Sequence, residues 1–304
     1  MNPCDPATLN GDLPLTRAQD AAYVNYHTRR NAANRTRSLD MGILSSRSPV
    51  WGWSLSGGSS PARAILDAYF WWAAAELRPA FDDRRVTIVD LGCGNGGRIG
   101  AFAAAGFQGE FIGLDIAASP KWPTRALAGL QPRLILGDLH RFDPAELPPI
   151  DLLISTTSLE HLRDDAGIVR KFEARLAPGS AQVHFVPAEA SLDLYGKHGW
   201  RQYSPACVRA LFPSAEIHRF GGPFSNELHL QTIRGPYLRG EPMLGQSRPR
   251  LYAVARSVAL VLDRLLGCPR PSMYAAFVRP DGHRRSSGQS PHEVRALPVA
   301  RHAA

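Results

Sequence analysis

One aspartate and four glycines between Val86 and Gly97 form the first group of residues whose types and spacing suggest chemistry. The stretch reads VTIVDLGCGNGG, an apolar, β-branched run that ends in Asp90 and continues into a glycine-rich turn. Such a turn lets a ligand approach the backbone closely. Residues 98–105 favour a helix, so the turn lies at a helix N-terminus, where free N–H groups favour an anionic or polar ligand group. The stretch therefore predicts a ligand site after a buried strand.

Two kinds of cofactor fit this turn. Gly92, Gly94 and Gly97 satisfy G-x-G-x-x-G, the pattern of dinucleotide binding. Asp90 with Gly92, Gly94 and Gly96 also forms D-x-G-x-G-x-G. A carboxylate here would repel a pyrophosphate, whereas it would attract a cofactor that carries an ammonium and a sulfonium. Asp90 therefore favours the second kind, and an NAD(P)-binding oxidoreductase is the alternative.

Acidic residues also follow the next two predicted strands. Residues 110–116 end in Asp115 and Ile116, and Asp138 follows the strand predicted over 133–136. An acid about 20 residues beyond the glycines suits the hydroxyls of a ribose in either kind of cofactor. The structural alternative is that each acid caps a turn or a helix.

Two histidines are candidates for proton transfer. His161 follows a fourth predicted strand, 151–156, and His198 lies in YGKHGWRQYS, residues 195–204, after a fifth strand, 181–187. Histidine titrates near neutral pH and suits the role of general base toward a hydroxyl. The mixture of aromatic and basic residues over 195–204 favours a polar, flat, sugar-like or anionic substrate. The alternatives are a backbone-bonded His161 and a loop whose aromatic residues pack on the core.

The pattern of predicted elements explains how these residues come together. Strands alternate with helices, which predicts right-handed crossovers and a parallel, doubly wound α/β sheet. Ligands of such sheets bind at the carboxyl ends of the strands. We predict helices over 17–37, 61–77 and 158–177, and two last strands over 215–220 and 272–278. The segment 221–267 between those strands is too long for a hairpin turn and is predicted to be a partly helical insertion.

Five short pieces between residues 84 and 187 carry a family resemblance. They read VDLGCGNG, GLDIA, LILGDL, DLLISTTSLEHL and LAPGS, in this order. Together they resemble the class I S-adenosylmethionine (SAM) dependent methyltransferases. The resemblance implies a seven-stranded, Rossmann-like sheet with an antiparallel last hairpin. We expect an N-terminal arm and helical cap over 1–80, the methyltransferase domain over 81–280, and a disordered basic tail over 281–304.

The resemblance also implies roles for individual residues. The glycine backbone would accommodate the methionine moiety of SAM, with Asp90 near its ammonium. Asp115 would accept the ribose hydroxyls, Asp138 the adenine amino group, and residues 155–158 would lie under the sulfonium. The predicted cofactor-binding residues are Asp90, Gly92, Gly94, Asn95, Gly96, Asp115, Ile116, Asp138, Leu139, Ser155 and Thr156. The predicted catalytic residues are His161 and His198, and the predicted acceptor-binding residues are Trp200, Arg201 and Tyr203.

Composition and the remaining motifs give little support for a nucleic-acid substrate or a metal site. The net charge of +8 comes almost entirely from arginine spread along the chain, which is a weak nucleic-acid signal. The tetrapeptide after the fourth strand is STTS rather than N-P-P-Y, which disfavours methylation of a base amine. The cysteines form no C-x-x-C pair, and the neighbouring acids at 164–165 lie in a predicted exposed helix, so we expect no metal.

These features predict a SAM-dependent methyltransferase that acts on a hydroxyl of a small molecule or glycan. The alternatives are the NAD(P)-binding oxidoreductase and a non-catalytic partner subunit that keeps the fold. A signal peptide is not evident, and the apolar stretch 251–266 carries Arg256, Asp263 and Arg264, which favours an amphipathic helix over a membrane span. We therefore expect a cytoplasmic location.

Overall fold

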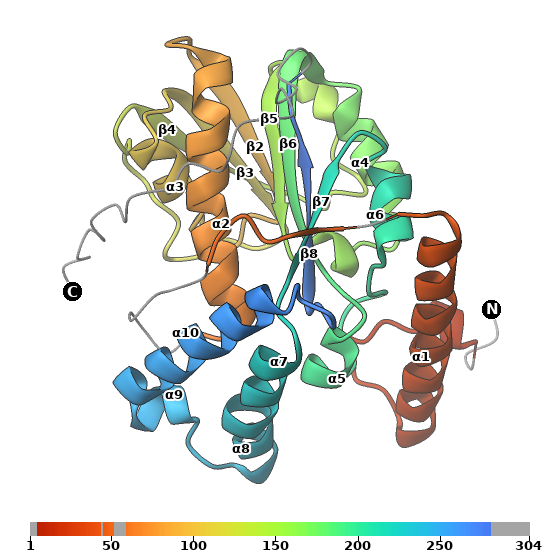
Figure 1. Ribbon diagram of the computed structural model, residues 1–304. Coiled ribbons are helices and arrows are strands. Elements are labelled where there is room, and N and C mark those ends of the chain that lie inside the picture. The colour runs from red at the N-terminus through yellow and green to blue at the C-terminus, as the bar shows by residue number, and fades with distance from the viewer. Residues whose placement is uncertain (1–4, 44, 52–58, 281–304) are drawn as a thin grey trace.

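An eight-stranded mixed sheet forms the centre of the computed structural model, which describes residues 5–43, 45–51 and 59–280 (Figure 1). Its strand order is β1-β7-β8-β6-β5-β2-β3-β4. The strands are β1 (Ser46–Arg47), β2 (Val86–Leu91), β3 (Gly109–Asp115), β4 (Leu130–Leu136), β5 (Ile150–Thr156), β6 (Leu176–Pro187), β7 (Glu216–Phe220) and β8 (Met273–Val278).

The strand directions confirm the predicted doubly wound fold. Strands β2 to β6 pair in parallel, and β8 lies between β6 and β7 and is antiparallel to both. The strand count is one higher than predicted, because β1 pairs in parallel with β7, Ser46 facing His218. A two-residue strand carries no alternating or β-branched pattern, so the sequence around it gives no strand signal.

Six helices precede β7 and its insertion. They are α1 (Arg17–Asp40), α2 (Pro61–Leu77), α3 (Ile99–Ala104), α4 (Asp165–Glu173), α5 (Ser191–Tyr195) and α6 (Pro205–Leu211). Side-chain hydrogen bonds cap two of these helices, α1 and α2, at their predicted first residues. The Thr16 hydroxyl accepts a hydrogen bond from the Gln19 N–H, whose side chain accepts one from the Thr16 N–H, and Ser60 caps α2 through the Arg63 N–H.

The helix predicted over 158–177 is wrong in length. The structure has a single 3-10 turn at Leu159–His161 and then the shorter α4, which Asp164 caps by accepting from the Gly167 N–H. Strand β6 begins at Leu176, five residues before the predicted start. Pro178 and Gly179 lie within it, where its register with β5 shifts, so they mark a bulge rather than a helix end.

Helix α2 packs most of its bulky apolar residues against the sheet. Tyr69 and Phe70 are fully buried, and their rings contact Phe185 of β6. The same helix begins with Pro61, and its first two turns also carry Arg63 and Asp67. These two polar residues line the cavity described below.

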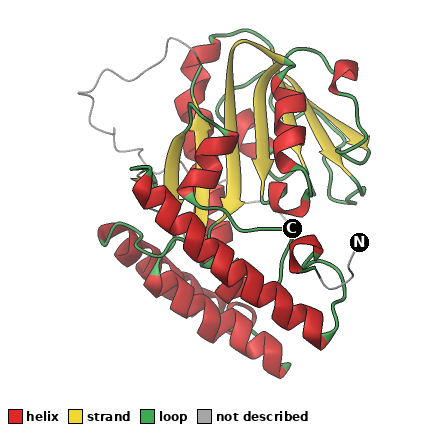
Figure 2. Cartoon of the chain, turned by 90° about the vertical axis from the view of Figure 1, so that its right-hand side faces the viewer, coloured by secondary structure: helices red, strands yellow, loops and turns green. Residues whose placement is uncertain are grey.

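The predicted insertion before the last strand is helical. Figure 1 labels its helices beyond the lower end of the sheet, and Figure 2 shows helices beyond that end from another side. They are α7 (Pro223–His229), a π-helical turn (Leu230–Arg234), α8 (Gly235–Arg239), α9 (Leu244–Ser247) and α10 (Pro249–Leu265). None of the described helices is both long enough and apolar enough to cross a membrane. The predicted tail over 281–304 lies outside the described residues.

Candidate active site

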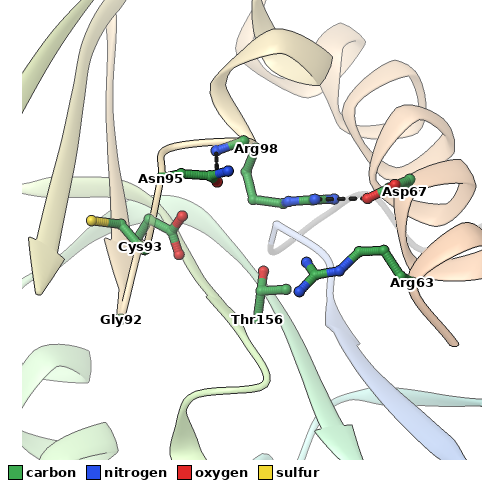
Figure 3. A pocket seen from close by; sticks show the side chains of 10 residues that line it. Arg63, Asp67, Gly92, Cys93, Asn95, Arg98 and Thr156 are labelled. Atoms are coloured by element: carbon green, nitrogen blue, oxygen red, sulfur yellow. Dashed lines mark hydrogen bonds and ion pairs between the residues drawn. The ribbon is translucent and has the colours of Figure 1, made fainter. Parts of the chain in front are cut away.

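A cavity of about 510 Å³ opens beside the glycine-rich turn, at the carboxyl ends of β2 and β5. Parts of α2, the turn after β2 and the end of β5 meet around it (Figure 3). Its lining residues are Arg63, Asp67, Asp90, Gly92, Cys93, Gly94, Asn95, Gly97, Arg98 and Thr156. The structure thus brings together five predicted cofactor-binding residues, namely Asp90, Gly92, Gly94, Asn95 and Thr156.

Asp90 is the buried acid of this cavity. Its side chain is 1% exposed, and neither carboxylate oxygen has a hydrogen-bond partner among the described residues. Burial raises the pKa of Asp90 to about 7, with the charge of Arg98 working against that rise. A buried carboxylate without donors is costly to ionise, so this position fits a ligand that brings its own cation.

The cavity also contains cationic groups that sequence reasoning missed. Arg98 forms an ion pair with Asp67 at 2.7 Å, which holds its guanidinium at the rim. Arg63 points across the cavity toward Thr156 (Figure 3), and its guanidinium forms no ion pair with any described residue. A usable signal was present, because Arg63 and Asp67 are four residues apart on one face of an otherwise apolar helix.

The glycine-rich turn is held in shape by Asp115 and by close packing. The Asp115 carboxylate accepts a hydrogen bond from the Gly94 N–H at 2.8 Å and another from the Ala117 N–H. Gly96 has a φ of +70°, and a Cβ there would lie 2.7 Å from the Trp122 ring. Only glycine fits this position, so the turn can pack directly against Trp122.

The remaining predicted cofactor residues lie outside the cavity lining. Ser155 is buried and its hydroxyl is hydrogen-bonded to His184 Nδ1 at 2.8 Å, so its side chain belongs to a core network. Ile116 is largely exposed, and Leu139 is buried. The Asp138 carboxylate accepts hydrogen bonds from the backbone and ring of His140, which lower its pKa. The adenine role of Asp138 and Leu139 stays a prediction.

The two predicted catalytic histidines lie together. The rings of His161 and His198 have their centroids 4.6 Å apart, edge to face. Asp12 lies on one side of the pair, with its carboxylate oxygens 2.7 Å from His161 Nδ1 and 3.6 Å from His198 Nδ1. Glu160 lies on the other side, with one oxygen 3.9 Å from Nε2 of each ring. We call these four residues the histidine cluster.

The histidine cluster has unequal electrostatics. The hydrogen bond to Asp12 raises the pKa of His161. Burial, assisted by the positive charge of His161, lowers the pKa of His198. Burial also raises the pKa of Glu160 to about 7, and neither of its oxygens has a hydrogen-bond partner among the described residues. Relative to free imidazoles, these shifts favour the cationic form of His161 and the neutral form of His198.

The N-terminal arm brings Asp12 into the histidine cluster. The Gly11 N–H donates to the Gly199 carbonyl at 2.9 Å, and the Asp12 carboxylate accepts from the Gly199 N–H at 2.9 Å. Tyr23 of α1 donates its hydroxyl to the carbonyls of His198 and Gly199. Sequence reasoning missed Asp12, and no local motif marks it, because its partners lie about 150 and 190 residues away.

Arg201 and Tyr203 contact the protein itself, and their acceptor role stays a prediction. Both side chains are bonded to the buried Asp165: Arg201 forms an ion pair with one carboxylate oxygen, and the Tyr203 hydroxyl donates to the other at 2.7 Å. Arg201 also donates to the carbonyls of Leu162 and Arg163. These contacts anchor the loop, while Nε of Arg201 has no hydrogen-bond partner among the described residues. Trp200 is half-buried beside Arg163, and its acceptor role stays a prediction.

The cavity and the histidine cluster are joined through a short segment. The Ser158 hydroxyl donates to the Leu91 carbonyl at 2.6 Å, immediately before the glycine-rich turn. A Cβ on Gly92 would lie 2.4 Å from that of Ser158, so the two segments are in close contact. The 3-10 turn that carries Glu160 and His161 begins at the next residue. A ligand in the cavity and one at the cluster would therefore be neighbours.

One family model and several solved structures are similar to this chain. A family model described as a methyltransferase domain matches residues 88–179. The chain is similar to a putative sarcosine dimethylglycine methyltransferase from Galdieria sulphuraria, with 15% identity, a TM-score of 0.45, and coverage of 82% of this chain and 98% of that one. It is also similar to the N-methyltransferase NodS from Bradyrhizobium japonicum, with 14% identity, a TM-score of 0.43, and coverage of 73% and 89%. No curated protein sequence matches the chain.

Proposed function

We propose that this chain, which belongs to the class I SAM-dependent methyltransferases through the domain matched over residues 88–179, methylates a hydroxyl oxygen of a small molecule or glycan. The observation that carries the proposal is the adjacency of two sites at one edge of the sheet. One is the cavity that contains the unpartnered Asp90, and the other is the histidine cluster. The first suits the cofactor and the second suits the acceptor.

The charges of the cavity match the amino acid end of SAM. Asp90 offers a carboxylate and Arg63 a guanidinium across the same cavity; among the described residues, the first has no hydrogen-bond donor and the second no ion pair. An α-amino acid carries one ammonium and one carboxylate, and a charge-assisted hydrogen bond to each would hold it in one orientation. Asp115 would hold the ribose hydroxyls while its backbone contacts keep the glycine turn in place. When bound, SAM supplies an electrophilic methyl group on a sulfonium.

The histidine cluster suits an acceptor that must lose a proton. A neutral hydroxyl is a weak nucleophile, and methylation at oxygen is faster when the group is deprotonated as it attacks. A neutral imidazole of the cluster can accept the proton of the hydroxyl, and the carboxylates beside the two rings can stabilise the imidazolium that forms. The three cluster residues with partial exposure, Asp12, His161 and His198, leave a route for a polar acceptor.

The experiment is a methyl-transfer assay with the purified full chain and SAM labelled in its methyl group. Phenols, sugars, hydroxy acids and amines serve as separate acceptor panels, and the labelled atom is located by NMR. The proposal predicts label on oxygen for at least one hydroxyl class. Label on nitrogen only would overturn the assignment of the attacked atom. S-adenosylhomocysteine (SAH) binding without transfer to any panel would count against the small-molecule acceptor.

A further inference from the structure

We propose that Asp12, His161 and His198 bind a first-row divalent transition-metal ion, with Glu160 as the carboxylate behind the two imidazoles. The site lies at the acceptor side of the active site. Its existence depends only on the residues described here, whereas its role in catalysis rests on the proposed function. The sequence predicted no metal, because it has no C-x-x-C pair and its neighbouring acids at 164–165 lie in a predicted exposed helix. The three proposed ligands come from three distant segments.

The donor atoms converge. One ligand atom from each of the three residues can be chosen so that all lie within 4.8 Å of one another. Asp12 presents one carboxylate oxygen to Nδ1 of each histidine, at 2.7 Å and 3.6 Å. Metal–ligand distances of about 2.1 Å place tetrahedral ligands about 3.4 Å apart. Small side-chain rotations would therefore open the cluster to an ion.

Glu160 is the independent observation that points to a ligand. It is fully buried, both of its oxygens lack hydrogen-bond partners among the described residues, and one lies 3.9 Å from Nε2 of each histidine. A metal bound at Nδ1 leaves the proton of each ring on Nε2, directed at Glu160. Metal-bound histidines usually donate their second N–H to a carboxylate in this way. The ion thus accounts for a buried acid that the cluster alone leaves unsatisfied.

The backbone around the cluster is fixed, as a metal site requires. Asp12 accepts from the Gly199 N–H, and the Glu160 carbonyl accepts from the Trp200 N–H at 2.7 Å. A Cβ on Gly199 would lie 2.4 Å from the Glu160 carbonyl oxygen, so the two loops are in close contact. Both histidine side chains remain more than a third exposed, which leaves open coordination positions for water or an acceptor oxygen.

The donor set selects the class of ion. Imidazole and carboxylate ligands suit zinc, manganese, iron and cobalt, whereas magnesium and calcium prefer oxygen ligands alone. In the proposed function such an ion acts as a Lewis acid on the acceptor hydroxyl. The O–H bond breaks, its electron pair stays on the metal-bound oxygen, and the proton passes to water. No change in oxidation state is involved.

The test uses the full chain without a histidine tag, freed of metal by chelation and dialysis. Zinc chloride is titrated by calorimetry, and cobalt chloride by visible absorption. We expect one equivalent to bind and the cobalt spectrum to show imidazole coordination. Asp12→Ala and His198→Ala should each weaken zinc binding by roughly 100-fold, and Glu160→Gln by about 10–100-fold.

His140→Ala is the matched control. His140 also pairs with an aspartate at the surface, with its Nδ1 3.0 Å from Asp138, but it has no second histidine beside it. It should bind zinc as the wild type does. SAH affinity, measured on every variant, shows that each one is folded.

Wild-type protein that takes up no stoichiometric zinc would overturn the metal site, whatever its affinity for SAH. Equal zinc affinity in the wild type, Asp12→Ala and His198→Ala would do the same. Stoichiometric zinc binding in a chain that binds no SAH would instead defeat the proposed function and leave the metal site standing.

Discussion

At the scale of single residues, the buried carboxylate of Asp90 links stability to function. Neither of its oxygens is hydrogen-bonded to a described residue, and burial raises its pKa to about 7. In the absence of ligand, ionisation of Asp90 therefore costs free energy that the folded chain must supply. An ammonium in the cavity would remove that cost, so cofactor binding and the charge of Asp90 are coupled.

Replacement of Asp90 by asparagine should remove the free-energy cost of ionising this carboxylate in the folded protein. The folded-state pKa lies above the ordinary value of 3.8, so the folded protein binds this proton more tightly than the unfolded chain does. Between pH 4 and pH 8, the unfolding free energy of the wild type should therefore fall by up to about 4 kcal/mol through this group. The unfolding free energy of Asp90→Asn should not show this fall. Urea unfolding without cofactor at both pH values measures this difference. Parallel pH profiles for the two proteins would contradict it.

A second prediction at this scale concerns His161. His161→Ala removes an imidazole from the acceptor side and leaves the lining of the cavity intact. We expect turnover to fall by about 10²-fold or more, with SAH affinity close to that of the wild type. Single-turnover kinetics and calorimetry measure the two quantities. Wild-type turnover would remove His161 from the reaction.

The sequence predicted the site residues that lie in or directly after the recognised motifs, and it missed Asp12 and Arg63, which lie outside them. Asp90, Gly92, Gly94 and Asn95 are contiguous, and their strand-turn-helix context fixes where they lie. Asp12 was missed because nothing near it in the chain reveals its partners. The ion pair of Arg201 was not foreseen, since the composition of a loop cannot distinguish a substrate contact from an ion pair with a buried acid.

At the scale of elements, α2 serves both the core and the cofactor cavity. Its aromatic residues pack on the sheet, while its first turns direct Arg63 into the cavity. Arg63→Gln keeps much of the side-chain volume and removes the charge. We expect SAH affinity to fall by about 1.5–3 kcal/mol, the range of a charge-assisted hydrogen bond. Arg250→Gln, an exposed arginine on α10, is the control and should leave calorimetric SAH affinity unchanged.

Helix α1 and the arm before it hold the loop at His198. Tyr23 is fully buried, and its hydroxyl donates to the carbonyls of His198 and Gly199. Tyr23→Phe removes the hydroxyl, so the carbonyls of His198 and Gly199 lose this hydrogen-bond donor. We expect a loss of about 1–3 kcal/mol in unfolding free energy and a higher KM for the acceptor, without a change in SAH affinity. Unaltered stability and KM would show that the arm does not position the loop.

Capping and periodicity explain which elements could be predicted. The starts of α1 and α2 follow from Thr16 and Ser60, whose side chains bond the first free N–H groups. The helix over 158–177 was predicted too long because its apolar spacing continues into β6. The residues at 176–179 join the sheet, where pairing with β5 outweighs local preference.

At the scale of the whole molecule, one edge of the sheet gathers residues from across the chain. The glycine turn follows β2, the histidine cluster combines the N-terminal arm with the segments after β5 and β6, and α2 closes the cavity. The parallel sheet could be predicted because several motifs occur in the order and spacing of one fold. The placement of the arm could not, because it depends on tertiary packing between segments that share no sequence pattern.

The central claim is that the cavity beside Asp90 binds SAM rather than a dinucleotide. Calorimetric titration of the full chain, first with SAH and then with NADH, tests it most directly. The account predicts stoichiometric, micromolar binding of SAH and no binding of NADH. Binding of NADH without binding of SAH would contradict the assignment of the cavity and the methyl transfer that depends on it.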